Sequence, residues 1–267
     1  MDISVLGNLG LIQGSLDDTA VFATYCRTKT WRPAFAQFFS DFFQGEEHGI
    51  FLDIGANIGL TTIPVARHPG VNCFCYEPDP ENFRYLRNNV QVNCPGGNVQ
   101  LFNLALFDSA GNFDFQRSGG NKGDHRLCRD RTDGALNEGQ WPVIQVPTVR
   151  LDDALPPHLG DTAGPLAAKI VVQGAETHVI AGGVSVLSRA NTMLIEIYPY
   201  GIERLQGDLT QLLRFCCLYF SRAVLNAGEH DNVLTWLPVQ DIASQLRDRY
   251  KTATGNAHEY FHLFLKK

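Results

Sequence analysis

Two acidic residues, each at the end of an apolar run, are the residues of this sequence best placed to do chemistry. Asp53 ends the first run and Glu77 ends the second, 24 residues further along (77 − 53). The turn after the first run contains Gly55, Asn57 and Gly59. A glycine turn followed about 20 residues later by an acid is typical of nucleotide sites, because a carboxylate there can accept hydrogen bonds from both ribose hydroxyls.

Two cofactors that contain adenosine compete for this pattern. The pyrophosphate of a nicotinamide cofactor requires G-x-G-x-x-G at the start of a helix, whereas this turn has two glycines with Asn57 between them. S-adenosylmethionine carries an ammonium, a sulfonium and a ribose but no phosphate, so Asp53 could attract its positive end and Glu77 its ribose. The pattern therefore favours S-adenosylmethionine, and a nicotinamide-dependent oxidoreductase is the less favoured alternative.

The elements that position these residues are predicted to alternate between apolar strands and helices. The predicted strands are 49–54, 71–76, 99–106, 143–149, 166–172, 192–198 and 260–265, with shorter ones near Phe113 and Ala223. The predicted helices are 35–43, 60–67, 80–90, 176–188, 203–220 and 241–249, and a surface connection is expected over 156–165. Apolar strands alternating with helices are typical of a parallel sheet covered by helices on both faces.

The chain is predicted to consist of an extension and one domain. Residues 1–48 form a strand and helix extension packed on the core, and residues 49–267 form the catalytic domain. Within the extension, phenylalanines recur at the spacings of one helix face, at Phe35, Phe38, Phe39, Phe42 and Phe43. A structural helix packed on the sheet is favoured here over an aromatic ligand site.

Composition excludes several classes of partner. The formal net charge is −6, from 22 Lys+Arg and 28 Asp+Glu, and no basic tract is present, so nucleic acid is not expected as a partner. No apolar run reaches the 18 or so residues of a membrane span, and the N-terminus lacks the basic start of a signal peptide, which predicts a cytoplasmic protein. Seven cysteines without a C-x-x-C pair predict reduced thiols and no metal site. No feature predicts an oligomeric state.

Several segments together resemble the FkbM-like methyltransferases. The matching segments are 51–59, 76–83, 105–108, 149–153, 169–176 and 194–197. The resemblance implies a class I methyltransferase (Rossmann-like) α/β fold, with a mostly parallel sheet, helices on both faces and an antiparallel last strand. It also implies S-adenosylmethionine as cofactor and methylation of a hydroxyl on a small metabolite or glycan. The family's cofactor positions then fall on Asp53, Gly55, Asn57, Gly59, Glu77 and Ala105.

The sequence departs from the family pattern after the strand at 166–172. Where the family usually has Asp and Glu, this chain has Val171 and Gln173. A catalytically silent S-adenosylmethionine-binding subunit is therefore a second hypothesis beside the active enzyme.

An alcohol acceptor requires a base, and the sequence offers three candidates. His125, in the glycine-rich segment 119–126, is the first choice, with Asp124 and Glu196 in reserve. A solvated surface loop is an equally good interpretation of that segment. Tyr198 and Tyr200 could line an acceptor pocket. An anionic acceptor could be favoured by Lys122, Arg126 and Lys169, although scattered surface charge is the simpler explanation.

Overall fold

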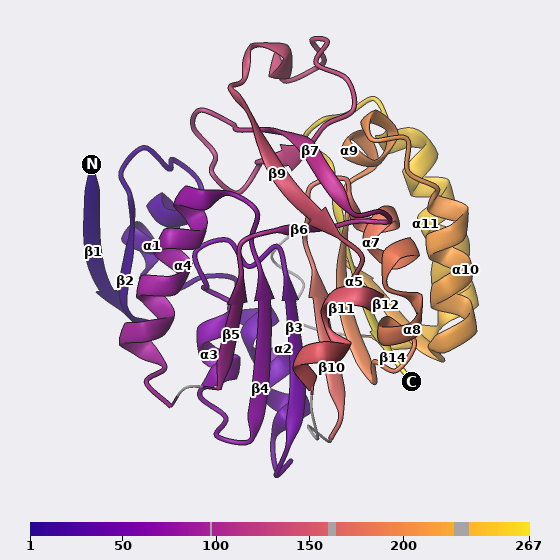
Figure 1. Ribbon diagram of the computed structural model, residues 1–267. Coiled ribbons are helices and arrows are strands. Elements are labelled where there is room, and N and C mark those ends of the chain that lie inside the picture. The colour runs from indigo at the N-terminus through magenta and orange to yellow at the C-terminus, as the bar shows by residue number, and fades with distance from the viewer. Residues whose placement is uncertain (97, 160–163, 227–234) are drawn as a thin grey trace.

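A large mixed sheet forms the centre of the computed structural model, which describes residues 1–96, 98–159, 164–226 and 235–267 (Figure 1). Its eight strands lie in the order β13-β12-β14-β11-β10-β3-β4-β5. Their bounds are β3 Gly49–Ile54, β4 Val71–Tyr76, β5 Val99–Phe102, β10 Leu166–Ile170, β11 Thr192–Ile197, β12 Arg222–Asn226, β13 Leu237–Pro238 and β14 Phe261–Lys266.

The direction of the strands confirms the expected fold class. Strands β5, β4, β3, β10 and β11 pair in parallel, and β14 pairs antiparallel with both β11 and β12. A parallel sheet with an antiparallel last strand inserted beside β11 is the class I methyltransferase arrangement. The strand order reverses between β3 and β10, and ligands of such sheets bind at the carboxyl ends of the strands beside that point.

Helices cover both faces of the sheet, because successive side chains of a buried strand point to opposite faces. On one face, Phe51 packs with helices α1 (Val21–Thr28), α2 (Pro33–Phe43), α3 (Thr62–Ala66) and α4 (Pro80–Asn93). On the other, Ile50 and Leu52 pack with the remaining long helices. Those helices and the short ones beside them are α5 Leu151–Ala154, α7 Glu176–Gly182, α8 Val184–Leu187, α9 Pro199–Arg204, α10 Leu209–Tyr219 and α11 Val239–Ala253.

A smaller sheet lies across the carboxyl ends of the large one (Figure 1). Its strands, in the order β6-β9-β7-β8, are β6 Ala105–Leu106, β9 Val143–Val149, β7 Gly111–Gln116 and β8 Arg126–Leu127. The prediction of one strand over 99–106 was therefore wrong, since β5 and β6 belong to different sheets. The chain leaves the large sheet at Asn103, whose side chain donates to the carbonyls of Glu77 at 2.8 Å and Pro78 at 3.1 Å.

The N-terminal residues are tied to the core by packing and hydrogen bonds. Strands β1 (Asp2–Gly7) and β2 (Gly10–Ser15) form a hairpin, and the backbone of Gln13 exchanges two hydrogen bonds with the side chain of Asn89. Helix α2 buries Phe39 completely, with its ring centroid 4.8 Å from that of Phe51. This confirms the structural role predicted for the phenylalanine helix, while the domain boundary after residue 48 stays a prediction.

Two predicted helices are each divided in the structure. The helix expected over 176–188 is interrupted at Gly183 into α7 and α8. The helix expected over 203–220 is two helices, α9 and α10, because Gln206 takes a positive φ of 61° and Asp208 caps the start of α10. In the connection after 155, a short helix α6 spans Pro156–Leu159, and residues 160–163 lie outside the described part of the chain.

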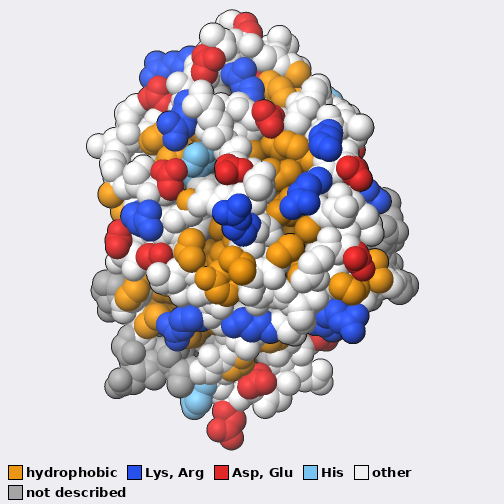
Figure 2. Space-filling model, turned by 90° about the vertical axis from the view of Figure 1, so that its right-hand side faces the viewer, with side chains coloured by type: hydrophobic (Ala, Val, Ile, Leu, Met, Phe, Trp, Pro, Cys, Tyr) orange, Lys and Arg blue, Asp and Glu red, His pale blue; other side chains and the backbone are white. Residues whose placement is uncertain are grey.

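No helix within the described ranges is long and apolar enough to cross a membrane. On the face to the right of Figure 1, basic and acidic side chains are interspersed, with apolar side chains between them (Figure 2). All seven cysteines are free thiols, five of them buried.

Candidate active site

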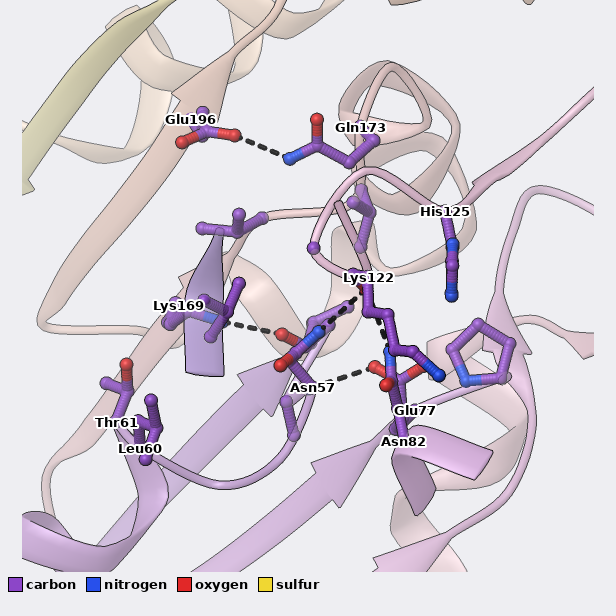
Figure 3. Close-up of a pocket in the computed structure, with 18 of the residues that line it drawn as sticks. Asn57, Leu60, Thr61, Glu77, Asn82, Lys122, His125, Lys169, Gln173 and Glu196 are labelled. Atoms are coloured by element: carbon purple, nitrogen blue, oxygen red, sulfur yellow. Dashed lines mark hydrogen bonds between the residues drawn. The ribbon is translucent and has the colours of Figure 1, made fainter. Parts of the chain in front are cut away.

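A cavity of about 390 Å³ opens at the carboxyl ends of β3, β4, β10 and β11, at the reversal of strand order. This volume lies within the roughly 300–1,000 Å³ typical of small-molecule sites. Its outer walls come from α1, from the connection between α1 and α2, and from residues 118–127, here called the covering segment. Figure 3 shows Gln173 and Glu196 at one end, and Glu77, Asn82 and His125 at the other.

The turn after β3 forms the floor of this cavity. Gly55 has a φ of 80°, and a Cβ there would lie 1.9 Å from the carbonyl oxygen of Val171, so only glycine fits. Asn57 has a φ of 51° and Gly59 one of 91°. Three left-handed residues in five reverse the chain tightly and bring its backbone to the cavity surface.

Glu77 follows β4 and faces the cavity from beside this turn. Its two carboxyl oxygens each accept a backbone N–H, one from Asn57 and one from Asp79, both at 2.9 Å. Burial raises the pKa of Glu77 to about 8, and it outweighs the two hydrogen bonds, which act in the opposite direction. The structure thus presents a buried acid, with remaining lone pairs, to whatever occupies this end of the cavity.

Asp53 lies beneath the turn rather than in the cavity wall. It is fully buried, and its carboxylate accepts from the ammonium of Lys169 at 2.8 Å and the hydroxyl of Thr62 at 2.7 Å. Lys169 also donates to the carbonyl of Gly55 and itself lines the cavity. The direct attraction of a ligand cation expected of Asp53 is therefore replaced by an ion pair that holds the turn in place.

Several described side chains of the cavity wall carry a buried polar atom without a hydrogen-bond partner in the part of the chain that the structure describes. These atoms include the Oδ1 atoms of Asn57 and Asn82, the Nε2 of His125 and the hydroxyl of Tyr76. Both asparagines donate their Nδ2 groups to the carbonyl of Lys122, at 3.1 and 2.9 Å, which holds the covering segment over the turn (Figure 3). Buried polar atoms are rarely left unsatisfied, so these atoms indicate a polar ligand.

The structure places His125 in the cavity wall, 8% exposed. Burial lowers its pKa to about 4, so the ring is neutral at physiological pH. Its Nδ1 accepts the backbone N–H of Ser118 at 2.9 Å, which leaves the ring proton on Nε2. A ring in this tautomer donates toward the cavity, and the base role expected of His125 stays a prediction that requires this hydrogen bond to break.

The two reserve bases have partners of their own. Asp124 pairs with Arg126 and is not among the cavity-lining residues. Glu196 does line the cavity, and its carboxylate accepts from Gln173 at 2.8 Å, from Arg32 at 3.2 Å and from His262 at 3.0 Å. Burial alone would raise the pKa of Glu196, but the His262 hydrogen bond and the Arg32 charge outweigh it and lower that pKa to about 2.

The other side chains considered for the acceptor pocket also form ion pairs or hydrogen bonds with other protein groups. The three cations form ion pairs, Lys122 with Glu81, Arg126 with Asp124 and Lys169 with Asp53, so they are not scattered surface charges. The expectation that Tyr198 and Tyr200 line the cavity was wrong. The Tyr198 hydroxyl donates to the carbonyl of Ala257 and that of Tyr200 to Glu138, which directs both away from it.

Ala105, the remaining cofactor position expected, does line the cavity at the start of β6. Sequence reasoning missed Asn82, although it lies in the matching segment 76–83, and missed the contribution of the extension. Trp31 and Arg32 come from the connection between α1 and α2 and form part of the wall. Within the described residues, no group of three or more His, Cys, Asp or Glu could hold a metal ion.

Comparison with known proteins identifies the family. The model of the methyltransferase FkbM domain matches residues 53–248, which include the turn, Glu77, the covering segment and Glu196. The chain belongs to the FkbM methyltransferase family. It is 32% identical over 163 residues to the 2-O-methyltransferase NoeI of Sinorhizobium fredii, a match that covers 55% of this chain and 62% of NoeI, less than two thirds of that protein.

A second relative is the hexuronic acid methyltransferase AglP of Haloferax volcanii. It is 27% identical over 186 residues, covering 70% of each chain. Among solved structures, a precorrin-6Y C5,15-methyltransferase of Geobacter metallireducens aligns over 87% of both chains with a TM-score of 0.40 and 12% identity.

Proposed function

We propose that this protein is an S-adenosylmethionine-dependent methyltransferase that methylates an oxygen of a sugar or small metabolite. The observation that carries the proposal is the set of unsatisfied buried polar atoms around Glu77, at the point of the sheet where class I methyltransferases bind their ligand. Family membership supports the reaction type.

The donors and acceptors in the cavity fit the cofactor. Glu77 and the Oδ1 of Asn82 can accept from ribose hydroxyls, and the Oδ1 of Asn57 can accept from an ammonium. The Nε2–H of His125 can donate to a nitrogen or oxygen of the nucleoside. Ala105 adds apolar surface to the lining. When bound, S-adenosylmethionine supplies a methyl group already activated by its sulfonium.

The protein contributes alignment and the exclusion of water. The ion pair of Lys169 with Asp53 and the glycine turn fix the floor, while Asn57 and Asn82 hold the covering segment above it. Holding a nucleophile and its target in line can contribute about 7–11 kcal/mol to lowering a barrier. A closed, aligned site is therefore sufficient for most of the rate enhancement.

The relatives support an oxygen on a sugar as the acceptor. NoeI is named a 2-O-methyltransferase and AglP a hexuronic acid methyltransferase. The cavity end formed by Trp31, Arg32, Gln173, Glu196 and Tyr260 combines aromatic rings with charged groups. Such a lining suits a polar molecule with apolar faces, as sugars are.

Titration calorimetry with S-adenosylmethionine and with NADH tests the cofactor. We expect binding of the first and none of the second; the reverse result would favour the oxidoreductase. Formation of S-adenosylhomocysteine with a panel of sugars tests turnover. Binding without turnover on any acceptor would favour the silent subunit suggested by Val171 and Gln173.

A further inference from the structure

The acceptor end of the cavity holds a strongly bound anion that is a poor proton acceptor. Glu196 accepts from Gln173, Arg32 and His262, so three donors occupy its two oxygens. Taking a proton from an acceptor would require it to give up part of this network. The lowered pKa of Glu196 supports the same conclusion, because a carboxylate that is so weak a base is a poor acceptor for the proton of a hydroxyl group.

Of the other titratable groups described in the wall, Glu77 lies at the opposite end of the cavity from Glu196, where the proposed function assigns it to the ribose (Figure 3). Four further groups are not placed to act as the base. His125 has its Nδ1 engaged by Ser118 and its proton on Nε2. Lys122 and Lys169 are engaged in ion pairs with Glu81 at 2.7 Å and Asp53 at 2.8 Å. Tyr76 has a phenol whose pKa is raised by burial, so it keeps its proton.

Positive charge also lines the cavity wall. Arg27 on α1 lies in the wall and, within the described residues, contacts the hydroxyl of Thr24 at 3.5 Å without forming an ion pair with an acid. Arg32 follows five residues later in the sequence, also lines the wall and pairs with Glu196. The guanidinium of Arg27 therefore has donors available for an anionic group of the acceptor.

From these observations we infer that the acceptor atom is a carboxylate oxygen and that the product is a methyl ester. This inference rests on the proposed function and makes it more specific. A carboxylate oxygen forms the new bond to the methyl carbon, the carbon–sulfur bond breaks with its electron pair left on sulfur, and no proton is transferred. The acceptor is thus already ionised at neutral pH, which removes the need for a base, and its charge is complementary to Arg27.

A matched pair of sugars tests the inference. The protein is incubated with S-adenosylmethionine tritiated in the methyl group and with para-nitrophenyl β-D-glucuronide or the corresponding glucoside, which differ at C6 in a carboxylate against a CH₂OH group. Mild alkali releases methanol from a methyl ester but leaves a methyl ether intact. We expect labelling of the glucuronide alone, with the label volatile after alkali. Alkali-stable label on either sugar would overturn the inference.

A binding measurement gives a readout that does not depend on turnover. In the presence of S-adenosylhomocysteine, calorimetry should detect the glucuronide and not the glucoside, and Arg27→Gln should weaken glucuronide binding about tenfold or more. Arg189→Gln is the matched control, because Arg189 lies before β11 at the opposite end of the sheet. Equal binding of both sugars, or no binding or labelling of the glucuronide although S-adenosylmethionine binds, counts against a carboxylate acceptor. Failure to bind S-adenosylmethionine itself would instead refute the proposed function.

Discussion

Binding of S-adenosylmethionine should release a proton from Glu77. In the free protein, burial holds the pKa of this carboxyl at about 8. Ribose hydroxyls donating to it and a nearby cationic ligand both favour the ionised form, so the pKa falls when the ligand binds. At pH 7 a group of pKa 8 is roughly 0.9 protonated, and binding should release about 0.9 proton.

The same linkage fixes the sign of the pH dependence. Because the ligand binds the form of the protein in which Glu77 is ionised, the affinity for S-adenosylmethionine should fall as the pH drops below 8. The loss should approach tenfold per pH unit. Between pH 7 and pH 5.5 the loss should be about 30-fold if the pKa in the complex is near 4.5. This window also lies below the usual α-amino pKa of about 7.7–8.0, so the ligand's own ammonium keeps its charge.

Calorimetry in buffers of different ionisation enthalpy measures the released proton directly. Glu77→Gln should abolish the release and weaken binding about tenfold or more, through lost charge-assisted hydrogen bonds. Glu176→Gln is the control, because Glu176 has a pKa raised to about 8 by burial and does not line the cavity. A binding enthalpy independent of the buffer in the wild-type protein would refute the reasoning.

Three further substitutions test the fold and the site. Phe39→Ala should reduce the free energy of unfolding in urea by about 3–5 kcal/mol, because the side chain is fully buried between helix and sheet; a loss below about 1 kcal/mol would contradict that packing. Gly55→Ala should abolish cofactor binding in calorimetry, since its Cβ meets backbone, while Gly96→Ala, with nothing within 4 Å, should bind normally. Gln173→Glu places a second carboxylate against Glu196, so the variant should lose more stability at pH 8 than at pH 5 in urea titrations, and equal losses would show that the two groups do not interact.

Much of the first half of the fold could be read from the sequence. The strands over 49–54 and 71–76 agree with β3 and β4 to the residue, because fully buried parallel strands are continuous apolar runs bounded by turns. The helix predicted to begin at residue 80 does so, because Pro80 suits a first helical turn and the Asp79 side chain before it accepts two backbone N–H groups. These are local signals, and local chemistry is sufficient to determine them.

The sequence did not show which distant segments pair with one another. Residues 99–106 form one apolar run, but β5 pairs with β4 and β6 with β9, and no local feature separates the two sheets. An apolar run shows that a segment is buried, and it does not show against what.

The candidate site divides in the same way. The sequence by itself determined the turn at 55–59 and the acid at 77, because glycines at positive φ and an acid at a strand end are fixed by residue type and spacing. The tertiary structure decided that Asp53 pairs with Lys169, 116 residues away, and that Arg32 and His262 meet at Glu196, 164 and 66 residues from it. Whether a carboxylate binds a ligand, stabilises the fold through an ion pair or accepts a proton depends on its burial and on the hydrogen-bond donors around it. These donors come from distant parts of the sequence and meet the carboxylate only when the chain has folded.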